Sequence, residues 1–132
     1  MGDQMDQTEH TKARPLSPHL QIYKPMLTMM MSILHRLTGV GLYFGALLFT
    51  WWLMAAASGP AYYEFVSELL GTLPGKAILI LASWGFFHHM LGGIRHFIWD
   101  FGKGFDLKEV EFMARAGLIG SLGLTALFWA LI

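Results

Sequence analysis

Three long stretches of the chain carry no charged residue, and they dominate its hydrophobic pattern. No Asp, Glu, Lys or Arg occurs between Leu37 and Tyr63, from Ala77 to Ile94, or from Ala116 to Ile132. Each stretch is close to the ~17–25 apolar residues that cross a bilayer as a helix. A soluble domain of this size would show alternating polar and apolar faces, and these stretches do not. The pattern predicts an all-α membrane protein with three transmembrane helices.

The polar segments between the stretches set the expected boundaries. Residues 1–27 are expected to form a polar N-terminal tail followed by an extended interfacial segment, because repeated prolines disfavour a helix there. Residues 28–132 are expected to form the transmembrane anchor domain. Its helices are predicted at about 28–57, 73–99 and 112–132.

Local signals refine these boundaries. Thr28 is a candidate N-cap for the first helix, and Ser58-Gly59-Pro60 should end it. The loop that follows can hold a short surface helix. The second loop is expected to run from Asp100 to Glu111, because it is polar and contains Gly102 and Gly104.

Composition supports a membrane protein and excludes several other classes. The 132 residues suit one domain, and charged residues make up 14% of them, against roughly 25% in soluble domains. The formal net charge is zero, so we expect no nucleic-acid partner. Without cysteine, the chain cannot itself ligate an iron–sulfur cluster or attach a c-type haem.

The distribution of Lys and Arg predicts an orientation. Lys12, Arg14 and Lys24 precede the first helix, and Lys103 and Lys108 lie in the second loop, whereas the first loop has a single lysine. By the positive-inside rule, the N-terminus and the second loop face the cytoplasm, or the matrix of a mitochondrion.

Six ionisable side chains fall inside the predicted helices: His35, Arg36, His88, His89, Arg95 and His96. Such residues are costly in a bilayer and are usually functional. In the predicted orientation all six lie in the cytoplasmic half or near the middle of the membrane. A proton path would need polar groups across the full depth, so the pattern argues against a pump or channel.

One face of the first helix combines a hydroxyl, an imidazole and a guanidinium. Ser32, His35, Arg36 and Gly39 are spaced i, i+3, i+4 and i+7, which places them on the same side. This face can hydrogen-bond a polar head group at the membrane edge. Alternatively, Arg36 reaches lipid phosphate, and Ser32 and His35 are polar residues at the membrane interface without a further role.

On the second helix, His89 lies between Gly85 and Gly93, one turn away on either side. A flat macrocycle bound by His89 would need that clearance, and a neutral imidazole is a good axial ligand for haem iron. Helix packing explains the glycines equally well, so the spacing leaves both interpretations open. His88 points roughly 100° away and is the weaker candidate.

If haem is bound, its propionate groups and the second coordination position of its iron also need partners. Arg95 and His96 can pair with the haem propionates. A second axial histidine is expected from another chain. Three helices enclose a cofactor poorly, so we expect this chain to be part of a heteromeric helix bundle.

Three blocks of sequence resemble the cytochrome b556 subunits of succinate dehydrogenase, the respiratory complex II. They are Arg-Pro-Leu-Ser-Pro-His-Leu-Gln-Ile-Tyr at 14–23, Ser-Ile-Leu-His-Arg-Leu-Thr-Gly at 32–39 and His-Met-Leu-Gly-Gly-Ile-Arg-His at 89–96. The resemblance runs from about Arg14 to Ile132. The first block is typical of the alphaproteobacterial and mitochondrial branch.

The resemblance implies a set of site residues. His89 would be an axial ligand of one b-type haem, shared with a second membrane anchor that supplies the other ligand. Ser32 and Arg36 would bind ubiquinone, and His35 would lie near a haem propionate. A weaker propionate role extends to Arg36 and Arg95.

The resemblance also implies partners and a location. A flavoprotein subunit with FAD would oxidise succinate, and an iron–sulfur subunit would pass the electrons on to ubiquinone. The dicarboxylate site would therefore be on another chain. The location would be the bacterial inner membrane, with a cytoplasmic N-terminus, or the mitochondrial inner membrane. The alternatives are a haem-free anchor and a fumarate-reductase-type anchor. A dihaem cytochrome would need two pairs of ligand histidines on facing helices, which this chain lacks.

Overall fold

The structure, a computed structural model, describes residues 24–132, which form four helices and no strand. The helices are α1 (Leu27–Ser58), α2 (Pro60–Gly71), α3 (Leu73–Asp100) and α4 (Leu107–Leu131). Three of them, α1, α3 and α4, are long and apolar enough to cross a bilayer. The all-α fold with three membrane-spanning helices is therefore confirmed. The expected polar tail, and most of the extended segment after it, lie outside the described residues.

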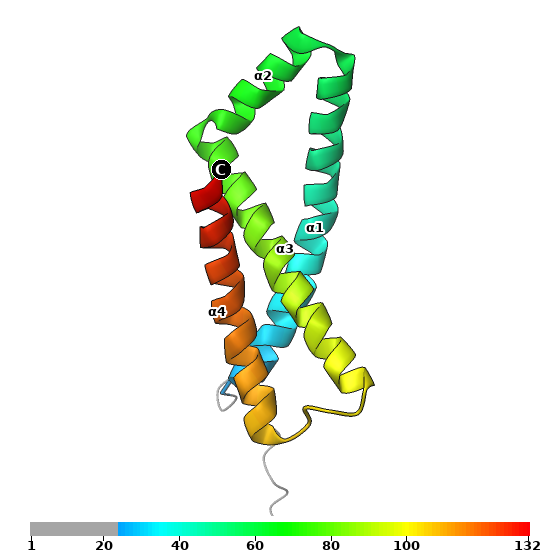
Figure 1. Ribbon diagram of the computed structural model, residues 1–132, viewed down its shortest axis with the longest axis vertical. Coiled ribbons are helices and arrows are strands. Elements are labelled where there is room, and N and C mark those ends of the chain that lie inside the picture. The colour runs from blue at the N-terminus through cyan, green and yellow to red at the C-terminus, as the bar shows by residue number, and fades with distance from the viewer. Residues whose placement is uncertain (1–23) are drawn as a thin grey trace, which may run out of the picture.

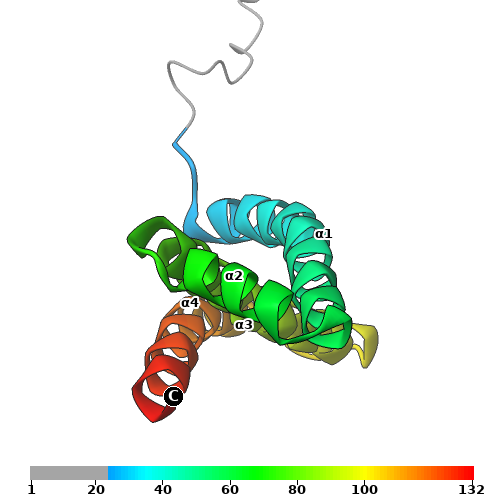
Figure 2. The ribbon, with the colours of Figure 1, turned by 90° about the horizontal axis from the view of Figure 1, so that it is seen from above.

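The helices are arranged around α3. Figures 1 and 2 show α1 and α4 on different sides of α3, with α1 crossing α3 at an angle. The short helix α2 spans the gap between the end of α1 and the start of α3 (Figure 1). The start of α1, the end of α3 and the start of α4 lie at the opposite end of the molecule from α2 (Figure 1).

The α1–α2 turn follows from its sequence. Gly59 has φ 120°, which a residue with a side chain rarely adopts, and Pro60 occupies the first position of α2, where a missing N–H costs nothing. The short surface helix expected in the first loop is confirmed. An indole hydrogen bond fastens it to α1, because Nε1 of Trp51 donates to the hydroxyl of Tyr62 at 2.9 Å.

Two helix starts differ from the sequence prediction. Helix α1 begins after Met26, whose backbone is extended, so Thr28 lies inside the first turn and is not the cap. Helix α4 begins at Leu107 rather than near residue 112. Asp106 occupies its N-cap position and Glu109 lies in its first turn, where negative charge favours the helix dipole. The second loop is correspondingly shorter than expected.

The buried part of the described chain is small and unusually polar. Its buried apolar residues are Met31, Ala55, Val66 and Ala114, and its buried polar residues are Thr38, His88, Arg95, Ser121 and Thr125. Most large apolar side chains are exposed, which is expected where lipid or other subunits cover them. Small and polar residues at helix contacts are typical of packing within membranes.

Candidate functional site

Two histidines meet where α1 crosses α3. The rings of His35 and His89 are stacked, with centroids 4.0 Å apart and planes inclined by 9°. Glycines on both helices make this contact possible. A Cβ on Gly92 would overlap the His35 ring, and a Cβ on Gly39 would lie 3.1 Å from Cε1 of His89. Each imidazole therefore packs against backbone of the opposite helix.

We expect the substitution Gly92→Ala to separate α1 from α3 and disrupt the stacked pair. Forcing a methyl group into a filled contact typically costs about 1–3 kcal/mol. Thermal unfolding of the purified protein measures this loss. Gly123→Ala on α4 is the matched control, because a Cβ there meets nothing within 4 Å. Equal stability of the two variants would contradict the close contact at Gly92.

The hydrogen bonds of His89 define its tautomer. Its Nδ1 lies 3.1 Å from the backbone carbonyl oxygen of His35 and 3.4 Å from the hydroxyl oxygen of Thr38. The Thr38 hydroxyl gives its only proton to the same carbonyl, at 3.0 Å. Both oxygens facing Nδ1 can therefore only accept, so Nδ1 carries the proton. In a neutral ring this leaves the lone pair on Nε2, which has no hydrogen-bond partner within residues 24–132.

The His35 ring has an unused nitrogen. Its Nε2 is buried and has no hydrogen-bond partner in the described chain. The exposed His96 ring lies 5.3 Å from the His35 ring and packs edge-on against Trp99. Trp99 in turn donates from Nε1 to the carbonyl oxygen of Gly104, at 3.0 Å. The second loop is thus tied to the end of α3 beside the histidines.

His88 points away from this cluster. It is 2% exposed, and its Nδ1 lies 3.4 Å from the hydroxyl of Ser121 on α4. Its ring also contacts Trp84. His88 is therefore enclosed between α3 and α4 of its own chain, where an external group cannot reach it.

The cationic and hydroxyl groups near the cluster lie in two different places. Ser32 and Arg36 are exposed on α1, and neither forms a side-chain hydrogen bond or ion pair within the described residues. Arg95 is 8% exposed and packs over the Trp99 ring at 5.1 Å, with its Nε buried and unpartnered. Within residues 24–132, the single ion pair joins Arg115 to Glu111. The guanidinium groups of Arg36 and Arg95 thus lack a carboxylate partner in the described part of this chain.

The glycines beside His89 are not equivalent. Gly85 faces α1, where its Cβ position lies 3.9 Å from the methyl carbon of Thr38, whereas a Cβ on Gly93 would meet nothing within 4 Å. The helix wall next to His89 is therefore open on the Gly93 side only. The close helix approach depends on Gly92, which the spacing argument did not single out.

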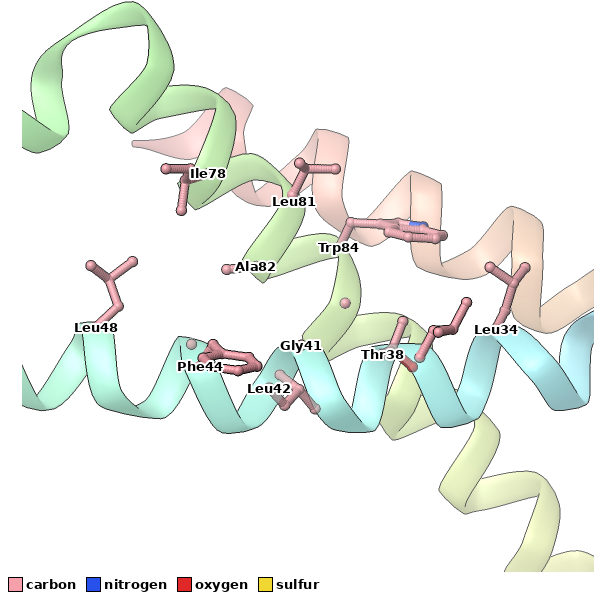
Figure 3. A pocket seen from close by; sticks show the side chains of 13 residues that line it. Leu34, Thr38, Gly41, Leu42, Phe44, Leu48, Ile78, Leu81, Ala82 and Trp84 are labelled. Carbon is pink, nitrogen blue, oxygen red and sulfur yellow. The ribbon is translucent and has the colours of Figure 1, made fainter.

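An apolar groove of about 530 Å³ opens between α1 and α3 on the side toward α2 (Figure 3). Leu48 and Ile78 line its wide part, and Thr38 and Trp84 lie where the helices converge (Figure 3). None of its lining residues is charged. The stacked rings of His35 and His89 therefore lie beyond the narrow end of this apolar groove.

Comparison with known proteins assigns the family. Residues 10–132 match the family described as "Succinate dehydrogenase/Fumarate reductase transmembrane subunit". The chain belongs to this family. The chain is also similar to the succinate dehydrogenase cytochrome b556 subunits of Rickettsia conorii and Paracoccus denitrificans. The first is 39% identical over 116 residues, covering 88% of this chain and 90% of the relative. The second is 37% identical over 114 residues, covering 86% and 88%.

A mitochondrial protein is also similar to this chain. The succinate dehydrogenase cytochrome b560 subunit of Sus scrofa is 38% identical over 123 residues, covering 86% of this chain and 71% of the relative. The resemblance to cytochrome b556 subunits that the sequence blocks indicate is therefore confirmed. These findings and the three apolar helices agree on a multi-pass membrane protein.

The sequence patterns did not single out Thr38 as a candidate site residue. The residue stands three positions after His35, at the start of the charge-free stretch that follows Arg36, and it is buried against the ring of His89. A lone threonine in a membrane helix commonly bonds its own backbone, so its identity alone carries no signal. Its position beside a histidine block was the available clue.

Proposed function

We propose that this chain is the membrane-anchor cytochrome b subunit of a succinate:ubiquinone oxidoreductase. Family membership supports an anchor role, and the names of the relatives support a b-type cytochrome. The observation that carries the proposal is the arrangement of His89, whose Nδ1 is anchored and whose Nε2 is free among the described residues. A haem-ligating histidine requires that arrangement, because metal-bound imidazoles usually donate their other N–H to a fixed acceptor.

His89 is the residue that would hold the haem iron. Haem b would supply one-electron redox chemistry between the iron–sulfur subunit and the quinone. His89 lies eleven residues before the end of α3 at Asp100, about 16 Å along the helix axis at ~1.5 Å per residue. That depth is near the middle of a hydrocarbon core of ~30 Å. The open helix wall at Gly93 leaves room for a flat ring system beside the imidazole.

The second axial ligand would come from another chain. Within residues 24–132, no other histidine is placed to hold the same haem together with His89. His35 is stacked face to face on His89, with no space for a porphyrin plane between the rings. His88 is enclosed between α3 and α4, and His96 lies two turns from His89 on the same helix. A second membrane anchor is the expected source, which makes the functional unit a heteromeric helix bundle.

Unpartnered donors around the cluster would hold the haem propionates. The exposed His96, which lies beside His35, could reach them directly. Nε2 of His35 and Nε of Arg95 are buried without a hydrogen-bond partner in the described chain, so a side-chain movement would have to bring them to the propionates. Arg36, the residue after His35 on α1, adds a positive charge that has no ion-pair partner among the described residues. Charge-assisted hydrogen bonds to carboxylates are the interactions that such donors form best.

Ser32 and Arg36 would bind the ubiquinone head group. Ser32 lies five residues from the start of α1, about 8 Å along the helix axis at ~1.5 Å per residue. Both side chains are exposed, so a head group at the membrane edge can reach them. The Ser32 hydroxyl can donate to a quinone carbonyl, and the fixed charge of Arg36 favours the negative charge that develops during reduction.

The partners and location follow from this role. The iron–sulfur subunit would dock on the cytoplasmic or matrix side, which by the positive-inside rule would also hold the N-terminus and the second loop. The flavoprotein subunit would carry FAD and oxidise succinate, so the dicarboxylate site would be on that chain. Membrane lipid would cover the remaining apolar surface, in a bacterial inner membrane or a mitochondrial inner membrane.

Purification of the complex through a tag on this chain tests the proposal. We expect three other subunits to co-purify: a flavoprotein, an iron–sulfur protein and a second small anchor. The complex should reduce ubiquinone with succinate and show a b-type haem band. A complex that contains no haem would support a haem-free anchor. Preferential reduction of fumarate by a quinol would support the fumarate-reductase alternative.

A further inference from the structure

We propose that Thr38 is a positioning residue for the haem-binding imidazole. Its hydroxyl and the His35 carbonyl form a pair of oxygens that holds Nδ1 of His89 in one orientation. This inference rests on the proposed function, because it assigns Thr38 a role in retaining haem at His89.

The geometry gives the hydroxyl of Thr38 a defined direction. It donates to the carbonyl oxygen of His35 at 3.0 Å, three residues earlier on α1. Its lone pairs then face Nδ1 of His89 at 3.4 Å, and the carbonyl faces the same nitrogen at 3.1 Å. The Nδ1–H group therefore lies between two acceptors that are themselves hydrogen-bonded to each other. Both acceptors belong to α1, whereas the imidazole belongs to α3.

The surroundings keep Thr38 in this position. The residue is 7% exposed at the helix crossing, and its methyl carbon lies 3.9 Å from where a Cβ on Gly85 would be. A threonine that bonds its own backbone has a fixed χ1. Rotation of the His89 ring would break contacts to both oxygens. Without the hydroxyl, a single backbone acceptor would have to hold the ring.

The expected consequence is weaker haem retention. Loss of a hydrogen-bond partner behind a metal-bound histidine typically lowers metal affinity by roughly 10–100-fold. In Thr38→Val, which removes the hydroxyl and keeps the shape, we expect haem to leave the purified complex faster by roughly that factor. Thr38→Ser, which keeps the hydroxyl, should restore the wild-type rate.

The experiment measures haem transfer from the whole detergent-solubilised complex to apomyoglobin. Electron paramagnetic resonance of the oxidised haem reports its axial ligation before transfer. Thr50→Val is the matched control, because Thr50 lies on the same helix and its hydroxyl also bonds a backbone carbonyl, that of Ala46 at 2.8 Å. If Thr38→Val does not assemble, Thr38→Ala and Thr38→Ser replace it, since alanine and serine differ only in the hydroxyl.

Each outcome decides the inference. Faster transfer and an altered resonance spectrum in Thr38→Val, with normal Thr38→Ser and Thr50→Val, would support it. Equal rates in Thr38→Val and the wild type would overturn it, and so would equal acceleration in Thr38→Val and Thr50→Val. A wild-type complex without haem would overturn the proposed function as well. If the wild-type complex contains haem, and His89→Leu loses it whereas Thr38→Val keeps it as the wild type does, this inference alone would be overturned.

Discussion

The substitution His89→Leu is expected to abolish the b-type haem band of the purified complex. Leucine removes the imidazole whose Nδ1 is anchored on α1 and whose Nε2 has no hydrogen-bond partner among the described residues. His88 also has an anchored Nδ1, on Ser121, but it is enclosed between α3 and α4. Without the His89 imidazole this chain would offer no ligand for the haem proposed here. The measurement is the reduced-minus-oxidised spectrum, together with the amount of haem per complex.

His88→Leu is the matched control on the neighbouring residue. His88 is enclosed between α3 and α4, so its loss should leave axial ligation and the haem band intact. A small loss of stability, about 1 kcal/mol, is expected from the missing hydrogen bond to Ser121. Ser121 still donates to the carbonyl of Leu118, so no buried donor is left unpaired. If His88→Leu lost haem and His89→Leu kept it, the assignment would be reversed.

The substitution Arg36→Leu is expected to reduce ubiquinone reduction strongly while succinate oxidation with a soluble dye acceptor survives. Removing one group that stabilises developing charge typically lowers a rate by on the order of 100-fold. Ser32→Ala should have a smaller effect in the same direction, because it removes one neutral hydrogen-bond donor. The two activities are measured on the same purified complex.

Arg115→Leu provides the control for loss of a guanidinium. Arg115 is exposed on α4 and pairs with Glu111, away from the His35–His89 cluster. Both activities of Arg115→Leu should match the wild type. Loss of both activities in Arg36→Leu would indicate failed assembly, and unchanged ubiquinone reduction would place the quinone site elsewhere.

The membrane-spanning helices could be predicted because a bilayer excludes charge. The charge-free stretches locate α1, α3 and the apolar part of α4. The start of α4 could not be found in this way, because Leu107-Lys-Glu-Val-Glu at 107–111 is polar and helical at once. Hydropathy reports where a helix meets lipid, whereas the helix itself continues into water for as long as its hydrogen bonds and its cap allow.

The residue types of the candidate site were predictable, but their directions were not. Helical spacing separates His88 from His89 by about 100°, yet it does not say which of them faces α1 and which faces α4. Likewise, the shared stripe on α1 divides in the structure. His35 packs against α3, whereas Ser32 and Arg36 remain exposed. These directions depend on where the neighbouring helices lie, which no single helix encodes.

The glycines illustrate the same limit. Spacing drew attention to Gly85 and Gly93 as clearance for a macrocycle, and only Gly93 faces open space. The glycine that the helix crossing requires is Gly92, because the His35 ring occupies the place of its side chain. Which glycine admits a neighbouring ring depends on the crossing angle of two helices, a tertiary property.

An experimental structure of the intact complex tests the central claim most directly. The account predicts a haem iron bonded to Nε2 of His89, with Nδ1 of that ring on the His35 carbonyl and the opposite axial imidazole supplied by a different chain. A structure in which His89 faces lipid, with no porphyrin near it, would contradict the account and leave the chain as a hydrophobic anchor alone.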